Sequence, residues 1–286
     1  VMGAAMAFGM YETPFAILVG LYGDRARRPI TGVALLGGLG STIGWPATLA
    51  FEQAFEWRGA CLAWAAIHIA ICMPLIIFTV SAARPPARPA AALAARVRWD
   101  RTMIQLAALF AGAWFVSTCM SAHLPRVLQA FGMTPSAAVA AASLVGVAAV
   151  SMRLAEFTIL RRFNPLASTR VATLLHPAGA GVLLAFGPAA GAALALGQGG
   201  GNGLLTVAKG VLPLHIYGAE NYAVRSAMIA TPARFLQAAG PALYGVIVDR
   251  SAVAAVVASS AVCLFMFAMT FGLARASTPV PEPVTA

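Results

Sequence analysis

A single ammonium group stands inside a long apolar stretch of the chain. Lys209 is the only lysine in the sequence, and it lies within TVAKGVLPLHIYG, residues 206–218. Glu12 is its acidic counterpart, since it lies within the otherwise uncharged segment MYETPFAIL, residues 10–18. A charge in apolar surroundings needs an opposite charge, a polar partner or water. These two residue types could bind an ion, hold an anionic group or exchange a proton.

Residues for metal binding or covalent chemistry do not form a recognisable pattern. The four histidines fall in four different apolar stretches, and no two share a spacing that would hold a metal. The four cysteines also fall in apolar stretches, without a CxxC pair. No HExxH, paired-aspartate or Ser/Lys signature is present, so a membrane-embedded enzyme is the weaker interpretation. We expect no metal, no cofactor and no enzymatic activity.

The surroundings of these charges are those of a membrane protein. Of the 286 residues 60% are hydrophobic and 10% charged, and the mean hydropathy is +0.82. Apolar stretches of about 20 residues, the length of a membrane-crossing helix, recur along the chain. Because alternating strand-like patterns are missing, we predict an all-α membrane protein. We expect nine transmembrane helices, at 1–22, 29–51, 59–81, 102–124, 134–158, 169–187, 190–217, 224–248 and 251–274.

The formal net charge of +10 comes mainly from arginines in alternate loops. By the positive-inside rule, the arginine-rich loops and the C-terminus face the cytoplasm, so the basic balance reports orientation and not a nucleic-acid partner. Arginine outnumbers lysine eighteen to one and alanine is abundant, which suggests a GC-rich bacterial genome. We therefore expect the lipid bilayer of a bacterial inner membrane to be the surrounding medium.

The beginning and end of the chain are related to each other. LYGDRARRPITGVALLGGLGSTIGWP (21–46) aligns with IYGAENYAVRSAMIATPARFLQAAGP (216–241), and the Tyr-Gly pair and the closing proline coincide at an offset of 195 residues. Spans one to three therefore look like a copy of spans seven to nine. Spans four to six would need counterparts before residue 1, which predicts a parent of twelve helices and about 380 residues.

This arrangement resembles the major facilitator superfamily of secondary transporters, with the chain as helices 4 to 12. Local motifs add to the resemblance: NGLLTVAKGVLPLHIYG (202–218) is similar to a helix 10 pattern, and SMRLAEFTILRRFNP (151–165) is similar to the loop motif between helices 8 and 9. The resemblance implies a remnant of the N-terminal half at 1–82, a cytoplasmic linker at 83–101 and a C-terminal six-helix half at 102–286.

The resemblance also implies alternating access to a midplane site lined by helices 1, 4, 7 and 10. Lys209 would lie on helix 10, about 10 Å from its cytoplasmic end at 1.5 Å per residue. A charge at such depth costs roughly 2.5–3.5 kcal/mol, so Lys209 and Glu12 should line the cleft. We expect Lys209 to attract an anionic group, and Glu12 to pair with it, bind a cation or take up a proton. The alternatives are a structural ion pair and a lysine that snorkels to the interface.

Four uncharged residues are weaker candidates for contact with a solute. Asn202 and Gln198 lie in the glycine-rich GQGGGNG (197–203), whose glycines also suit close helix packing. Tyr11 is adjacent to Glu12, and His123 lies on helix 7, which lines the cavity in the superfamily.

Three further charges are expected to act in gating or in structure. Arg153 and Glu156 are three residues apart near the inner end of helix 8, where they can pair on one face and suit a cytoplasmic gate. Arg234, deep in helix 11, is expected to pair with a carboxylate or with carbonyl groups.

The function predicted from these observations is proton-coupled secondary transport of a small, anionic solute. Since the cavity would lack one wall, we expect the chain on its own not to transport. The alternatives are thus a non-transporting remnant of such a transporter and, less favoured, a membrane-embedded enzyme.

Overall fold

The computed structural model describes residues 11–80 and 97–273, and within them the side chains outside 39–46, 49, 79 and 80. The described residues are almost entirely helical and contain no strand. The helices are α2 (Glu12–Tyr22), α3 (Arg27–Ile67), α4 (Met73–Val80), α5 (Arg101–Ala130), α6 (Pro135–Thr158), α7 (Pro165–Phe186), α8 (Gly191–Tyr217), α9 (Tyr222–Arg250) and α10 (Ala252–Met269).

Each of the nine predicted spans corresponds to a helical segment, although some helices begin and end at other residues than the predicted spans do. Helix α3 contains the second predicted span and the beginning of the third. Glu56, at φ 57° and ψ 176°, interrupts the helix between them. A π-helical turn at His68–Cys72 then joins α3 to α4. Most of the predicted linker, 83–101, lies outside the described residues, as does the start of the first span.

Five segments of the described chain are long and apolar enough to cross a membrane, judged by length and composition alone. They are Ala50–Phe78, Arg101–Ala130, Pro135–Thr158, Pro165–Tyr217 and Ala252–Met269, and the fourth contains both α7 and α8. The all-α membrane class predicted from the sequence is therefore confirmed. Membrane crossing by α2, the first part of α3 and α9 stays a prediction.

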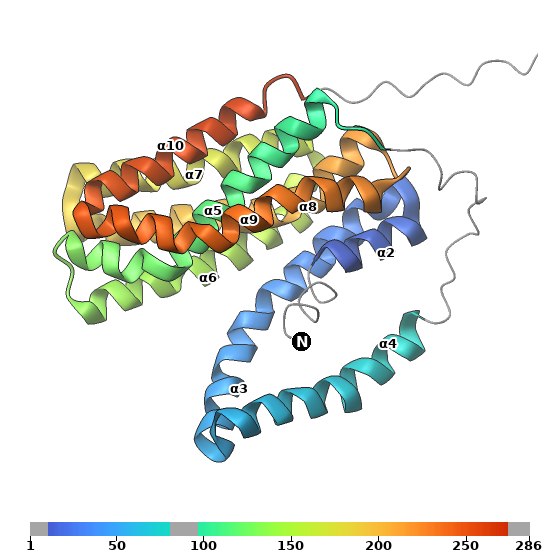
Figure 1. Ribbon diagram of the computed structural model, residues 1–286, viewed down its shortest axis with the longest axis horizontal. Coiled ribbons are helices and arrows are strands. Elements are labelled where there is room, and N and C mark those ends of the chain that lie inside the picture. The colour runs from blue at the N-terminus through green and yellow to red at the C-terminus, as the bar shows by residue number, and fades with distance from the viewer. Residues whose placement is uncertain (1–10, 81–96, 274–286) are drawn as a thin grey trace, which may run out of the picture.

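Helices α5 to α10 pack into one bundle around α8, which is almost completely buried (Figure 1). The glycines of 197–203 explain this. A side chain at Gly203 would lie 2.5 Å from the Ala149 carbonyl oxygen of α6, and one at Gly201 would lie 2.7 Å from the Ala172 carbonyl oxygen of α7. Without side chains at these positions, α8 approaches the backbones of both neighbours. Since α8 continues as a helix through this stretch, the glycines do not loosen it.

The predicted internal repeat reappears in the helix boundaries. At the offset of 195 residues, the part of α3 that precedes the break at Glu56, 27–55, corresponds to the whole of α9, 222–250. Helices α2 and α8 both end at a glycine with positive φ, Gly23 at 56° and Gly218 at 71°, a conformation that favours glycine. The N–H groups of these glycines cap carbonyls that are also 195 residues apart, on Val19 and Leu214.

Helices α2 and α3 meet the bundle at one end only. Phe15, Val19 and Ile30 form a buried apolar cluster with Val207 and Val211 of α8. Beyond this contact, α3 runs away from the bundle and the chain through α4 lies apart from it (Figure 1). None of the apolar stretch in Ala50–Phe78 is buried within the structure. The segment Ala50–Phe78 therefore presents its apolar side chains to the surroundings, as a lipid-facing helix does.

Candidate solute-binding site

One carboxylate and two cations meet where α2, α8 and α9 come together. Lys209 Nζ and Arg234 Nη2 each donate to Glu12 Oε1 at 2.8 Å. The Lys209 side chain is only 8% exposed, and those of Glu12 and Arg234 are 21% and 28% exposed. The structure thus brings together the two charges singled out in the sequence and adds a third, Arg234, which pairs with a carboxylate. A role in solute binding stays a prediction for Glu12 and Lys209, and a role in gating or structure stays a prediction for Arg234.

Residue 210, next to Lys209, explains how α2 comes within reach of α8. A side chain at Gly210 would lie 2.6 Å from Phe15 of α2 and 2.7 Å from Ile30 of α3. Because glycine leaves this space free, α2 packs close enough for Glu12 to reach the ammonium. The Tyr222 hydroxyl of α9 donates to the Gly210 carbonyl at 2.9 Å, which fixes α9 against the same turn.

Trp114 of α5 forms the aromatic floor under both cations. Lys209 Nζ lies 4.4 Å from the Trp114 ring centroid, and Arg234 Cζ lies 5.1 Å from it. The Tyr11 ring is 5.6 Å from Lys209 Nζ on another side. Cations over aromatic faces are stabilised by the ring quadrupole, most strongly over Trp. The sequence analysis did not single out Trp114, although it lies on the span that the resemblance implies as helix 7.

The cluster carries a net charge of +1 and is incompletely paired. Both cations contact the same oxygen of Glu12, and among the described residues Oε2 is buried without a hydrogen-bond partner. Buried polar atoms are rarely left unpaired. The arrangement can therefore accept one more negative group on its cations, or one proton on the free carboxylate oxygen.

A cavity of about 650 Å³ opens beside the cluster, within the range of small-molecule sites. Its lining combines apolar and aromatic side chains with the two cations and one amide. The described residues that line it are Tyr11, Pro14, Val33, Leu36, Gly37, Trp114, Lys209, Arg234 and Gln237. The chain thus provides a site with a charged end and an apolar wall, contributed by α2, α3, α5, α8 and α9.

The uncharged candidates lie at different distances from this cavity. Asn202 borders a separate small void that Trp114 and Lys209 also line. Gln198 lies further inside the bundle, beside His176, in a second small void that Asn202 also borders. His123 points elsewhere, since its Nε2 lies 2.9 Å from the Pro241 carbonyl oxygen of α9. The structure therefore groups Tyr11 and Asn202 with the charged cluster and sets His123 apart from it.

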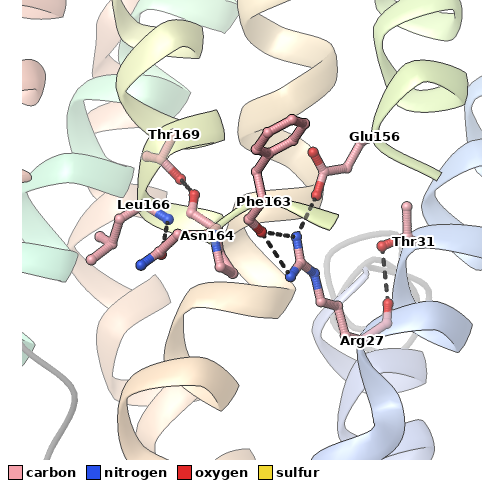
Figure 2. Close-up of polar contacts among 8 residues, drawn as sticks. Arg27, Thr31, Glu156, Phe163, Asn164, Leu166 and Thr169 are labelled. Atoms are coloured by element: carbon pink, nitrogen blue, oxygen red, sulfur yellow. Dashed lines mark hydrogen bonds and ion pairs between the residues drawn. The ribbon is translucent and has the colours of Figure 1, made fainter. Parts of the chain in front are cut away.

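A second polar cluster joins the start of α3 to the end of α6 (Figure 2). Arg27 Nη2 pairs with Glu156 Oε1 at 3.1 Å, and the Arg27 guanidinium donates twice to the Phe163 carbonyl oxygen at 3.2 Å. The suggested pairing of Arg153 with Glu156 was thus wrong. Arg153 instead donates to Thr206 Oγ1 of α8 at 3.3 Å, and its guanidinium lies against Gly38 of α3.

This second cluster, Arg27 with Glu156 and the Phe163 carbonyl, links α3 to the six-helix bundle at an arginine-rich end. A further bond lies at the same end, from the Ala219 N–H to Asp24 Oδ1 at 3.0 Å. Among the described residues no ion pair other than that of Glu12 joins α2 or α3 to the bundle away from this end. Apart from the pairs of Glu12, the ion pairs that join α2 and α3 to the bundle within the described chain are therefore confined to this end.

Comparison with known proteins supports the fold. No protein-family model matches the sequence, and no curated protein matches it either. Among solved structures, the chain is similar to the Escherichia coli fucose:proton symporter FucP, with a TM-score of 0.64. The chain therefore shares its overall fold with this structure. The identity is 16%, and the match covers 89% of this chain and 71% of the symporter chain. At this identity the likeness supports the fold alone, and the all-α membrane class predicted from the sequence is confirmed.

Proposed function

We propose that the protein is a secondary transporter of the major facilitator superfamily that carries a small anionic solute by alternating access. The observation that carries this proposal is the cavity beside Lys209 and Arg234, where two cations share one carboxylate. The net positive charge favours an anion over a cation. The fold likeness to a fucose:proton symporter supports transport as the activity.

In this proposal the anionic group of the solute binds to the cations, and Glu12 accepts the coupling proton. An arriving carboxylate can replace Glu12 on Lys209 or Arg234, because both cations already bind a carboxylate oxygen at 2.8 Å. The free Oε2 of Glu12 can take a proton without first losing a hydrogen bond. Coupling by a proton then follows from competition of the solute and Glu12 for the same cations.

Binding can be tested with the 286-residue chain in detergent. We expect benzoate and lactate to change the fluorescence of Trp114, and fucose to change it less, because the sugar carries no charge. Lys209→Gln and Arg234→Gln should each weaken binding by about tenfold or more, since a hydrogen bond between charged groups contributes roughly 1.5–3 kcal/mol. Arg126→Gln is the matched control, since Arg126 is exposed and pairs with Asp249 elsewhere. Unaltered binding in both cavity variants would exclude the site.

Flux into proteoliposomes distinguishes transport from mere binding. A chain that transports on its own should accumulate the labelled acid that binds, and an inwardly directed proton gradient should accelerate uptake. Such uptake would overturn the expectation from the sequence that the chain alone does not transport. Binding without flux would favour the alternative that the chain is a non-transporting part of a longer transporter. The orientation in a bacterial inner membrane, with the arginine-rich loops and the C-terminus cytoplasmic, belongs to the same proposal and can be checked with a reporter fused to the C-terminus.

A further inference from the structure

The two chain segments that meet in the Arg27 cluster are unusually basic. Residues 23–28 and 156–163 together carry five arginines and two carboxylates. Both carboxylates already have partners, since Asp24 accepts the Ala219 N–H and Glu156 pairs with Arg27. The remaining arginines are exposed, and within the described chain none of them forms an ion pair: Arg25, Arg28, Arg161 and Arg162.

The contacts of Arg27 in Figure 2 hold together the two chain segments that carry these exposed arginines. The two bonds from Arg27 to the Phe163 carbonyl tie the start of α3 to the residue that directly follows Arg161 and Arg162. Arg28 lies over the Phe157 ring of α6, with its Cζ 5.8 Å from the ring centroid. Positive charges from two distant parts of the sequence thus come together where residues 23–28 meet residues 156–163, a contact that we call the seam.

Apolar side chains are exposed beside the arginines. Ile159 is 60% exposed and Phe163 is 57% exposed, both between or next to the charged residues. Water alone would not favour large apolar groups at a loop, whereas the region where headgroups meet acyl chains suits basic and apolar side chains together. The surface therefore fits a ligand with an anionic head and an apolar body.

We propose that this seam is a binding site for an anionic phospholipid, whose phosphate bridges the arginines of 23–28 and of 156–163. Guanidinium groups match phosphate oxygens in a forked geometry, and basic clusters at a membrane surface attract anionic lipids. The exposed Ile159 and Phe163 select a lipid over free phosphate, because they offer contact area only to acyl chains. This inference does not depend on the solute or on transport.

A lipid bound in this way contacts the start of α3 and the end of α6 at once. Since Arg27 already joins them there, the headgroup would add charge-assisted bonds across the same seam and favour its closed form. The bound lipid thus stabilises the contact between α3 and the end of α6, and its dissociation weakens that contact.

The test is isothermal titration calorimetry, in which dioctanoyl-phosphatidylglycerol is titrated into the detergent-solubilised 286-residue chain. We expect saturable binding, and binding weaker by on the order of tenfold in the double variant Arg161→Gln with Arg162→Gln. The matched control is Arg58→Gln with Arg250→Gln, which removes two exposed arginines that are not part of the seam. This control should bind as the parent does.

Three outcomes would overturn the proposal. Equal binding by the seam variant and the parent would exclude the arginines, and equal weakening in the control would reduce the effect to net charge. Inorganic phosphate that binds as tightly as the lipid would make this a phosphate site. Dioctanoyl-phosphatidylcholine, which has no net charge, should show no saturable binding. Circular dichroism of each variant establishes that loss of binding is not loss of fold.

Discussion

The two related triplets, α2–α4 and α8–α10, share the junction between their first two helices but not their environment. In both, the first helix ends at Tyr-Gly, and the part of α3 before its break at Glu56, 27–55, matches the whole of α9 at the same offset. Yet α8 is buried along most of its length, whereas the apolar stretch within Ala50–Phe78 is not buried at all. Local chain chemistry therefore determines where helices begin and end, and small residues determine which of them pack together.

The charges are divided between the triplets as well. The first provides the carboxylate of Glu12 and the second provides Lys209 and Arg234. Because the partners come from different triplets, their attraction acts across the interface and not within one packed unit. The two triplets are thus complementary in charge although they are similar in outline.

The largest effect is expected from reversal of this charge complementarity. Lys209→Glu places two carboxylates together and should lower the free energy of unfolding by about 3–5 kcal/mol, the usual cost of an unpaired buried charge. Exchange of both charges, Glu12→Lys with Lys209→Glu, should recover most of the loss. Unfolding by SDS in mixed micelles measures both. If the double variant is no better than the single one, the charges are not coupled across the interface.

The second test asks whether close packing is confined to the second triplet. A side chain at Gly199 would collide with the Val145 carbonyl of α6, so Gly199→Ala should cost roughly 1–3 kcal/mol of stability. Gly20 of α2 has nothing within 4 Å of its side-chain position. Gly20→Ala should therefore be neutral or stabilise the chain by about 0.5–1 kcal/mol, since alanine favours the helix. Effects of the same sign would remove the proposed contrast.

The third test concerns the feature that the triplets share. Gly23→Ala and Gly218→Ala each place a side chain in a backbone conformation with positive φ, and each should cost about 1–3 kcal/mol. Thermal unfolding midpoints in detergent compare the two variants. A loss for Gly218→Ala alone would mean that α2 and α3 do not unfold together with the bundle.

The smallest effect is expected at the seam. Arg27→Gln removes one partly exposed ion pair, which contributes up to about 1 kcal/mol, so opening of the seam should increase by no more than about fivefold. Maleimide labelling of Ala26→Cys, a fully buried position, measures this opening after Cys61 and Cys72 are replaced by serine. The control is Arg28→Gln, because Arg28 forms no ion pair among the described residues. Equal labelling of the two variants would show that Arg27 does not hold the seam.

The sequence predicted the helices well because apolar length and Tyr-Gly caps are local properties. It also indicated that Glu12 and Lys209 share one neighbourhood, since the repeat places both at similar depth. It did not predict Trp114 beneath the cations, or the pairing of Glu156 with Arg27, because both depend on how distant helices pack. The pairing with Arg153 was inferred from helix spacing alone, and such spacing says nothing about a competing partner on another helix.

The bond between Asp24 and Ala219 has a geometric consequence. These two residues are equivalent positions in the repeat, being 195 residues apart, and yet they touch. Positions that a two-fold rotation exchanges can meet only close to its axis, so any two-fold axis that relates the two triplets passes near this hydrogen bond. Rotation of one triplet against the other about a point near this bond would displace the Asp24 loop less than residues farther from the bond. The Asp24 loop would then lie close to the hinge of such a motion.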